Sequence, residues 1–135
     1  MRICIHSIAV VTLLLLGSLK SQAQFSAHKS TEKLFSGTWI NKKTTRHLEI
    51  SFENGYATII DWTSKFQKPE SGDVYKAFLK NGILVMPEDK EHHAPYSEIR
   101  IKGNKLIYFS RYSLLETSPK WDKEEFTRTA NPHLN

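Results

Sequence analysis

The stretch LEISFENGYATIIDWT, residues 48–63, decides the fold class. Asn54 and Gly55 lie at its centre, between two runs that are rich in apolar and β-branched side chains. Asn and Gly accept the positive φ angles that a two-residue hairpin turn requires. The stretch therefore predicts two antiparallel strands, Leu48–Glu53 and Tyr56–Thr63, joined by a tight hairpin.

The same turn signal occurs twice more, at Asn81-Gly82 and at Gly103-Asn104. The remaining strands are expected at Thr38–Lys42, Asp73–Lys80, Ile83–Met86, Tyr96–Lys102, Lys105–Ser110 and Glu124–Thr129. Helical periodicity is absent after Gly37, and only Ser30–Phe35 is expected to form a turn or two of helix, with Ser30 as its cap. The sequence predicts an all-β fold, a small antiparallel meander of about eight strands that closes into a barrel or folds into a compact sandwich.

Each two-residue turn also fixes which side chains share a face of the sheet. Leu48 is expected opposite Asp61, with both facing the interior. The residues predicted to line an interior cavity are Asp61, Tyr75, Met86 and Tyr108. Apolar residues that would point outward include Ile60, Trp62, Phe78 and Phe109. These four need a cover from the helix, from the segment Ser113–Asp122 or from a partner; alternatively, a longer turn at Asn54-Gly55 would reverse one strand and bury Ile60 and Trp62.

The first 23 residues have the composition of an export signal. Arg2 precedes the apolar run Ile8–Leu16, and the small residues Ser21 and Ala23 match the positions that a signal peptidase reads. The apolar run is too short to cross a bilayer comfortably. We expect residues 1–23 to be a signal peptide and residues 24–135 to be one periplasmic or secreted domain without a transmembrane segment; an uncleaved signal anchor is the alternative.

Removal of this signal would change the composition of the chain. The chain has 19 basic and 14 acidic side chains, and Arg2 and Lys20 would leave with the signal, so the formal charge would fall from +5 to +3. The lysines are scattered among acids, which argues against nucleic-acid binding. The single cysteine, Cys4, would also leave. The mature domain would then have no disulfide, no cysteine nucleophile and no metal site built on sulfur.

A short motif opens the predicted meander. Gly37-Thr38-Trp39 follows the helix and begins the first strand, and in this arrangement the chain resembles a lipocalin-like (calycin-type) domain, especially the reduced domains of exported bacterial proteins. The resemblance implies that Gly37 and Trp39 close one end of a barrel. It also implies that a basic residue near the end of the chain packs on the tryptophan, and Arg128 is the positional candidate. The Thr-Asp-Tyr type motif of the full lipocalins is absent.

The sequence shows no pattern typical of an enzyme. Serines do not occur in a nucleophile elbow, and a glycine-rich phosphate loop is absent. His92-His93 lies in a loop bounded by prolines, and adjacent histidines of a strand point to opposite faces, so we expect neither a metal site nor a cofactor. Asp61 is the acid expected to face inward, where a tyrosine or an arginine at the barrel mouth would satisfy it.

Two non-enzymatic hypotheses follow. In the first, an exported barrel holds a small apolar or amphipathic ligand, with Asp61 fixing the polar end of that ligand. In the second, side chains fill the barrel and the outward apolar residues bind a protein partner, such as an envelope component, a toxin or a second copy of the chain. Hydrolysis at a polar cluster around Asp61 or His92 is a weaker third option.

Overall fold

The structure is a computed structural model of the 135-residue chain, and it describes residues 23–24, 26–111 and 120–129. The chain divides into two units, Met1–Lys33 and Leu34–Asn135, and all the strands belong to the second. The predicted signal peptide, residues 1–23, lies outside the described residues except for Ala23. Among the helices that are described, none is both long enough and apolar enough to cross a membrane.

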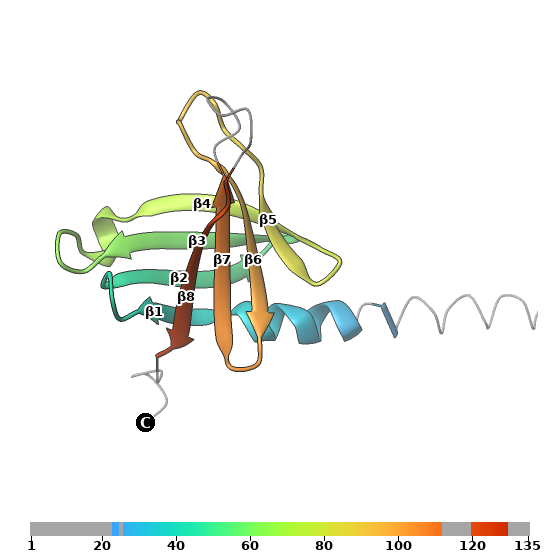
Figure 1. The fold of residues 1–135 in the computed structure, drawn as a ribbon. Helices are drawn as coiled ribbons and strands as arrows, with labels where there is room; N and C mark the ends of the chain where they lie inside the picture. Colours follow the sequence, from blue (N-terminus) through green and yellow to red (C-terminus); the bar gives the residue numbers. More distant parts are fainter. Residues whose placement is uncertain (1–22, 25, 112–119, 130–135) are drawn as a thin grey trace, which may run out of the picture. The chain divides into compact units, whose positions relative to one another are not determined.

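Eight antiparallel strands form a closed barrel in which each strand pairs with its neighbours in sequence and β8 pairs with β1 (Figure 1). They are β1 (Gly37–Asn41), β2 (Arg46–Glu53), β3 (Tyr56–Thr63), β4 (Asp73–Lys80), β5 (Ile83–Met86), β6 (Tyr96–Lys102), β7 (Lys105–Arg111) and β8 (Asp122–Arg128), with the 3-10 helix η1 (Pro69–Ser71) before β4. The predicted all-β meander is confirmed, and it closes into a barrel instead of forming a sandwich.

The hairpin turns have the geometry that the sequence predicts. Asn54 and Gly55 have φ angles of 54° and 83°, so the turn between β2 and β3 contains two residues. Leu48 therefore lies opposite Asp61, and the alternative of a longer turn is wrong. The predicted registers of the other two hairpins are also observed, Leu79 opposite Leu84 and Ile99 opposite Tyr108.

The helix before the barrel is longer than predicted. It includes residues 26–35, so Ser30 lies inside it and is not its N-terminal cap. The hydroxyl of Ser30 donates a hydrogen bond of 3.0 Å to the carbonyl of Ser26, one turn earlier. A serine within a helix can satisfy its hydroxyl in this way, and its presence alone therefore does not mark a helix start.

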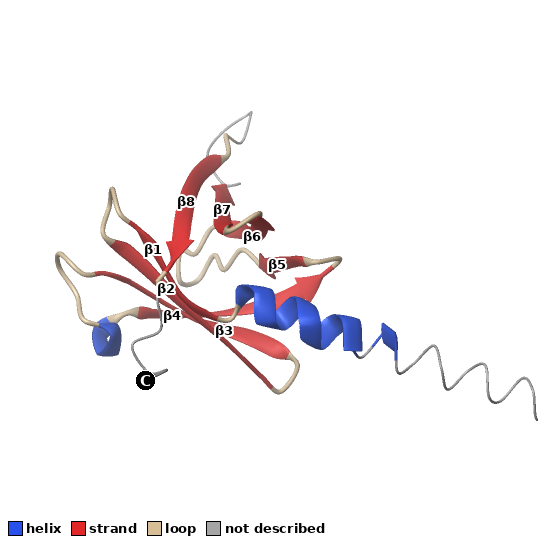
Figure 2. Cartoon of the chain, turned by 90° about the horizontal axis from the view of Figure 1, so that it is seen from below, coloured by secondary structure: helices blue, strands red, loops and turns tan. Residues whose placement is uncertain are grey.

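The strands of the barrel are drawn red in Figure 2, and their apolar side chains fill the middle of the barrel and one of its ends. The largest of them is Trp39, which is 2% exposed and whose ring nitrogen donates a hydrogen bond of 2.8 Å to the carbonyl of Phe35. The core around it comes from strands on all sides of the barrel, and its fully buried members include Leu48, Ile59, Leu84, Ile99 and Phe126. These side chains pack against one another in this part of the interior.

Arg128 covers Trp39 at this closed end. Its guanidinium carbon lies 4.3 Å from the centroid of the Trp39 ring, and the group donates hydrogen bonds to the carbonyls of Leu34, at 2.7 Å, and Ser36. Gly37 permits this close approach, because it has a φ of 113° and a β-carbon there would lie 3.0 Å from Nη1 of Arg128. The contact between Arg128 and Trp39 that the resemblance implies is therefore present.

At the other end of the barrel, two neighbouring strands, β4 and β5, are paired over only part of their length. In Figure 1, β1 to β4 run across the view, whereas β5 to β8 run steeply relative to them. β4 pairs with β5 through Phe78–Lys80, and its earlier part, Asp73–Ala77, pairs with β3. The start of β4 therefore diverges from the end of β5, and a cavity lies where the two strands separate.

Candidate ligand-binding site

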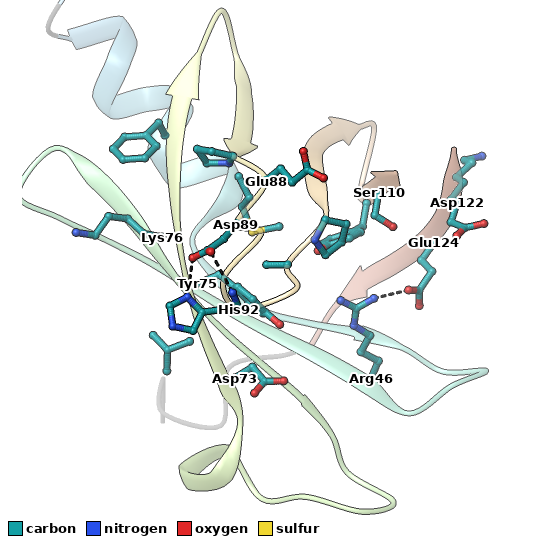
Figure 3. A pocket seen from close by; sticks show the side chains of 18 residues that line it. Arg46, Asp73, Tyr75, Lys76, Glu88, Asp89, His92, Ser110, Asp122 and Glu124 are labelled. Carbon is teal, nitrogen blue, oxygen red and sulfur yellow. Dashed lines mark hydrogen bonds and ion pairs between the residues drawn. The ribbon is translucent and has the colours of Figure 1, made fainter. Parts of the chain in front are cut away.

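A cavity of about 1120 Å³ opens at this second end of the barrel (Figure 3). The starts of β2, β4 and β8 and the ends of β5 and β7 contribute to its wall, and residues from the segment 87–95 complete it. Its volume is of the order of pockets that hold small molecules, which measure roughly 300–1,000 Å³. The barrel is thus filled at one end and hollow at the other.

Three of the four residues predicted to line a cavity lie in this wall: Tyr75, Met86 and Tyr108. Met86 and Tyr108 are 5% and 6% exposed, and Tyr75 is half-buried. Phe78, from the same strand as Tyr75, also lines the cavity. Together these side chains give the cavity an apolar, aromatic wall.

Asp61, the fourth predicted residue, faces inward but is already paired. Its carboxylate oxygens accept hydrogen bonds from Nε of Arg46 at 2.9 Å and from Nη2 at 2.5 Å. Asp61 is 8% exposed, and the side chain that lines the cavity is that of Arg46. An arginine therefore satisfies the inward carboxylate at the barrel mouth, which is one of the two solutions that the sequence suggests.

Arg46 also joins this pair to β8. Its Nη1 donates to the carboxylate of Glu124, and the second oxygen of Glu124 accepts a bond of 3.0 Å from the side-chain amide of Asn41 (Figure 3). The amide oxygen of Asn41 in turn accepts a bond of 3.0 Å from the backbone N–H of Lys43 in the turn before β2. A continuous polar network therefore connects β1, β2, β3 and β8 at the cavity.

Burial and charge act in opposite directions on Arg46. Burial lowers the pKa of its guanidinium, but the hydrogen bonds and charge of Asp61, together with the charge of Glu124, raise the pKa overall above its ordinary value. Burial also raises the pKa of both Tyr108 and Tyr75, and the charge of Asp73 raises the pKa of Tyr75 further. At neutral pH the arginine is charged and both tyrosines are neutral.

The ring of Tyr108 supports the arginine from inside the barrel. The guanidinium carbon of Arg46 lies 4.6 Å from the centroid of this ring, and Phe126 packs against the ring at a centroid distance of 6.5 Å. The Tyr108 hydroxyl donates a hydrogen bond of 3.3 Å to the fully buried hydroxyl of Ser97. These contacts fix the cationic and aromatic groups of the cavity relative to one another.

The residue before Arg46 has an unusual backbone. Thr45 has a φ of 58°, in the left-handed region that β-branched residues rarely enter. Its carbonyl accepts bonds from the backbone N–H of Ser64, at 3.0 Å, and from the ring of His47, at 2.9 Å. Its own hydroxyl is buried without a hydrogen-bond partner among the described residues. The hydrogen bonds from Ser64 and His47 therefore hold Thr45 in an energetically unfavourable backbone conformation directly before Arg46.

The four outward apolar residues do not form one surface. Trp62 is 7% exposed and stacks on His47 at a centroid distance of 4.9 Å, and Ile60 is half-buried. Phe78 lines the cavity. Phe109 lies on β7, far around the barrel from β3, and packs against Trp121 at 6.3 Å. Alternation along a strand predicts which face a residue is on, but neither its place around the barrel nor what covers it.

His92 lies at the rim of the cavity. Its Nδ1 lies 2.8 Å from Oδ2 of Asp89, and this contact lowers the pKa of the Asp89 carboxyl. Asp89 and Ala94 close the loop with two backbone hydrogen bonds, and both His92 and His93 are exposed, as expected of a solvated loop. Within the described part of the chain, no group of three or more potential ligand side chains is placed to hold a metal ion.

Sequence reasoning missed Arg46 and Glu124. The predicted second strand began at Leu48, two residues late, and the alternation of Leu48 and Ile50 extended back to Arg46 would have placed the arginine on the inner face. Phe126 is fully buried, and the same alternation from Phe126 places Glu124 inward. The signal was present in both strands, but the predicted second strand stopped short of Arg46, and the predicted strand Glu124–Thr129 was not assigned an inner face.

The fold and cavity define the chain as a small, closed, eight-stranded antiparallel β-barrel with one filled and one hollow end. This architecture is consistent with a lipocalin-like fold. In comparisons with family models, with curated protein sequences and with solved structures, the chain gives no significant match.

Proposed function

We propose that this protein is an exported, non-enzymatic, lipocalin-like binding protein that holds a small amphipathic ligand in the hollow end of its barrel. The observation that carries the proposal is the cavity of about 1120 Å³ with Tyr75, Met86 and Tyr108 in its wall. Eight-stranded barrels are just wide enough to hold one small molecule when side chains do not fill them. A filled interior would have argued against ligand binding, and the filling here stops short of this end.

The lining favours a ligand with two different parts. The aromatic and thioether side chains of the wall suit an apolar body, whereas the network of Arg46 and Glu124 suits a polar group. Pockets of this composition orient a ligand through a few polar contacts and gain most of their binding free energy from apolar burial. The polar end of the ligand would meet Arg46 and Glu124 in place of Asp61, because Arg46 already engages the Asp61 carboxylate.

Filling the cavity tests this proposal. In Met86→Trp a larger side chain would occupy the cavity. In Ile83→Trp, the matched control, the same side chain would point outward from the start of β5, opposite Lys80 and away from the cavity. We expect the wild type and Ile83→Trp to bind the neutral amphiphile octyl glucoside in calorimetric titrations below its micellar concentration. Binding to Met86→Trp should be at least about tenfold weaker.

Two further measurements make the result decisive. Circular dichroism and thermal unfolding check that both variants keep the barrel, and nuclear magnetic resonance should show chemical-shift changes at Tyr75 and Tyr108 on addition of the amphiphile. Equal binding by Met86→Trp and the wild type would show that the ligand lies elsewhere. Absence of binding by the wild type, both to octyl glucoside and to charged amphiphiles with the same tail, would refute the amphiphile proposal.

A further inference from the structure

The net charge of the side chains around the cavity is opposite in sign to that of the chain as a whole. The chain has a formal charge of +5, whereas the cavity is lined by five carboxylates and three cations, a formal charge of −2 with His92 neutral. The carboxylates are those of Asp73, Glu88, Asp89, Asp122 and Glu124, and the cations are Arg46, Lys76 and Lys123. Figure 3 shows acids from several segments around the opening.

The three cations are engaged by other groups of the protein. Arg46 is paired with both Asp61 and Glu124, and one positive charge between two carboxylates leaves that group net negative. The ammonium of Lys76 lies 4.2 Å from the ring centroid of Tyr56, and that of Lys123 bonds to Glu125 at 3.0 Å. An anionic ligand would have to compete with these partners for every cation, and it would separate a largely buried ion pair if it took Arg46.

The aromatic wall is the independent second feature. Tyr75, Phe78 and Tyr108 line the same cavity as the acids. The faces of aromatic rings carry negative charge density and bind ammonium groups, most strongly where water is excluded. Burial raises the pKa of Tyr75, and the charge of Asp73 raises it further. The effect of Asp73 agrees with a negative electrostatic potential at this wall.

We infer that the ligand is a cationic amphiphile, a molecule with an ammonium group attached to a small apolar body. The ammonium group would lie between the ring of Tyr75 and the carboxylates of Asp73 and Asp122, because Arg46 already occupies Glu124 and the face of Tyr108. The apolar body would contact Met86 and Phe78. This inference rests on the proposed function, because it assigns the charge of a ligand in the same cavity.

A series of ligands that share one tail and differ in charge tests the inference. Calorimetric titration of the purified protein with octyltrimethylammonium, octyl glucoside and octanoate, each below its micellar concentration, should rank the cation first and the anion last. We expect the cation to bind about tenfold more tightly than the neutral ligand at low salt. The difference should shrink as added salt screens the carboxylates.

A pair of charge-neutralising variants makes the test specific to the cavity. Asp73→Asn combined with Asp122→Asn removes two exposed carboxylates at the rim and should reduce the preference for the cation over the neutral ligand severalfold. Glu53→Gln is the control, because Glu53 is an exposed carboxylate at the turn of the first hairpin and should leave the preference unchanged.

The outcomes separate the inference from the proposed function. If the neutral ligand or the anion binds as tightly as the cation, and Met86→Trp weakens that binding, the cavity is a ligand site but the charge assignment is wrong. If the cation binds best but the double Asn variant binds it with the same preference as the wild type, the preference does not come from these acids and the inference falls. If none of the three ligands binds the wild type, both proposals fail.

Discussion

The two ends of the barrel use the same kind of contact for different purposes. At each end an arginine lies over an aromatic ring, Arg128 over Trp39 at 4.3 Å and Arg46 over Tyr108 at 4.6 Å. At the closed end the arginine donates to two backbone carbonyls, whereas at the open end it donates to two carboxylates. The first arrangement ties the chain entering β1 to the end of β8, and the second places a set of charges around a cavity.

The difference shows that the hydrogen-bond acceptors determine whether an arginine stacked on an aromatic ring joins backbone segments or neutralises carboxylates. The guanidinium of Arg128 donates to backbone carbonyls, so it holds two segments of the chain together and closes that end of the barrel. The guanidinium of Arg46 is needed to offset the desolvation of the buried Asp61 carboxylate, so its removal should cost more.

The same substitution at both arginines should give unequal losses of stability. Arg46→Met leaves Asp61 buried without its cation, and we expect it to lower the free energy of unfolding by about 3 kcal/mol. Arg128→Met removes an exposed side chain whose acceptors remain accessible to water, and we expect about 1 kcal/mol. Urea denaturation at neutral pH measures both values.

A second variant checks that the loss at the open end comes from the uncompensated acid. Arg46→Met combined with Asp61→Asn should recover part of the stability that Arg46→Met loses, since the remaining side chain is then uncharged. Equal losses in the two single variants would contradict the comparison between the ends, and so would the absence of any recovery in the double variant.

Gly37 should tolerate substitution less well than another glycine with positive φ. Gly37→Ala forces alanine into a φ of 113° and places its β-carbon 3.0 Å from Nη1 of Arg128, so we expect a loss of about 2 kcal/mol. Gly55→Ala is the control, because Gly55 has a φ of 83° but no atom within 4 Å of the added carbon, and we expect about 1 kcal/mol. Thermal unfolding of both variants gives the difference, and a smaller effect at Gly37 would show that Arg128 moves away freely.

The sequence predicts the closed end of the barrel better than the open end. Turn signals such as Asn54-Gly55 fix the register locally, and the register in turn places apolar residues such as Leu48 and Ile59 inside. The open end depends on contacts between residues far apart in the chain, above all Arg46 with Glu124, which no local pattern specifies. The divergence of β4 from β5, which creates the cavity, likewise follows from the path of the whole sheet.

Replacing Thr45 should relieve backbone strain at the open end of the barrel. Thr45→Gly removes a β-branched side chain from a φ of 58° and also removes a buried hydroxyl without a hydrogen-bond partner among the described residues. The free energy gained by removing this strain should exceed the free energy lost because glycine makes the unfolded chain more flexible. We therefore expect a gain of about 1 kcal/mol in the free energy of unfolding. Denaturant unfolding measures this gain, and a loss of stability would show that the threonine side chain contributes contacts that outweigh the strain.

High pH should weaken the open end through its tyrosines, although this is the smallest effect we predict. Burial raises the pKa of Tyr75 and of Tyr108, so both stay protonated in the folded protein at pH values where the unfolded chain has begun to lose those protons. Their contribution to stability is therefore complete below the ordinary tyrosine pKa of 10.0 and is lost as the pH rises through their folded-state values. The closed end should lack this dependence, because Trp39, the aromatic ring that fills it, does not ionise.

Tyr75→Phe and Tyr56→Phe form the pair that isolates the effect. Tyr75→Phe should flatten the fall in stability above pH 10, whereas Tyr56→Phe, near the hairpin turn of β3 and outside the cavity, should leave the slope as in the wild type. Ultraviolet absorbance of tyrosinate during a pH titration should show the corresponding loss of a late-ionising group in Tyr75→Phe. If both variants keep the wild-type slope, the alkaline sensitivity does not come from the half-buried tyrosine of the cavity wall, and the two ends of the barrel would differ in their charges but not in their response to pH.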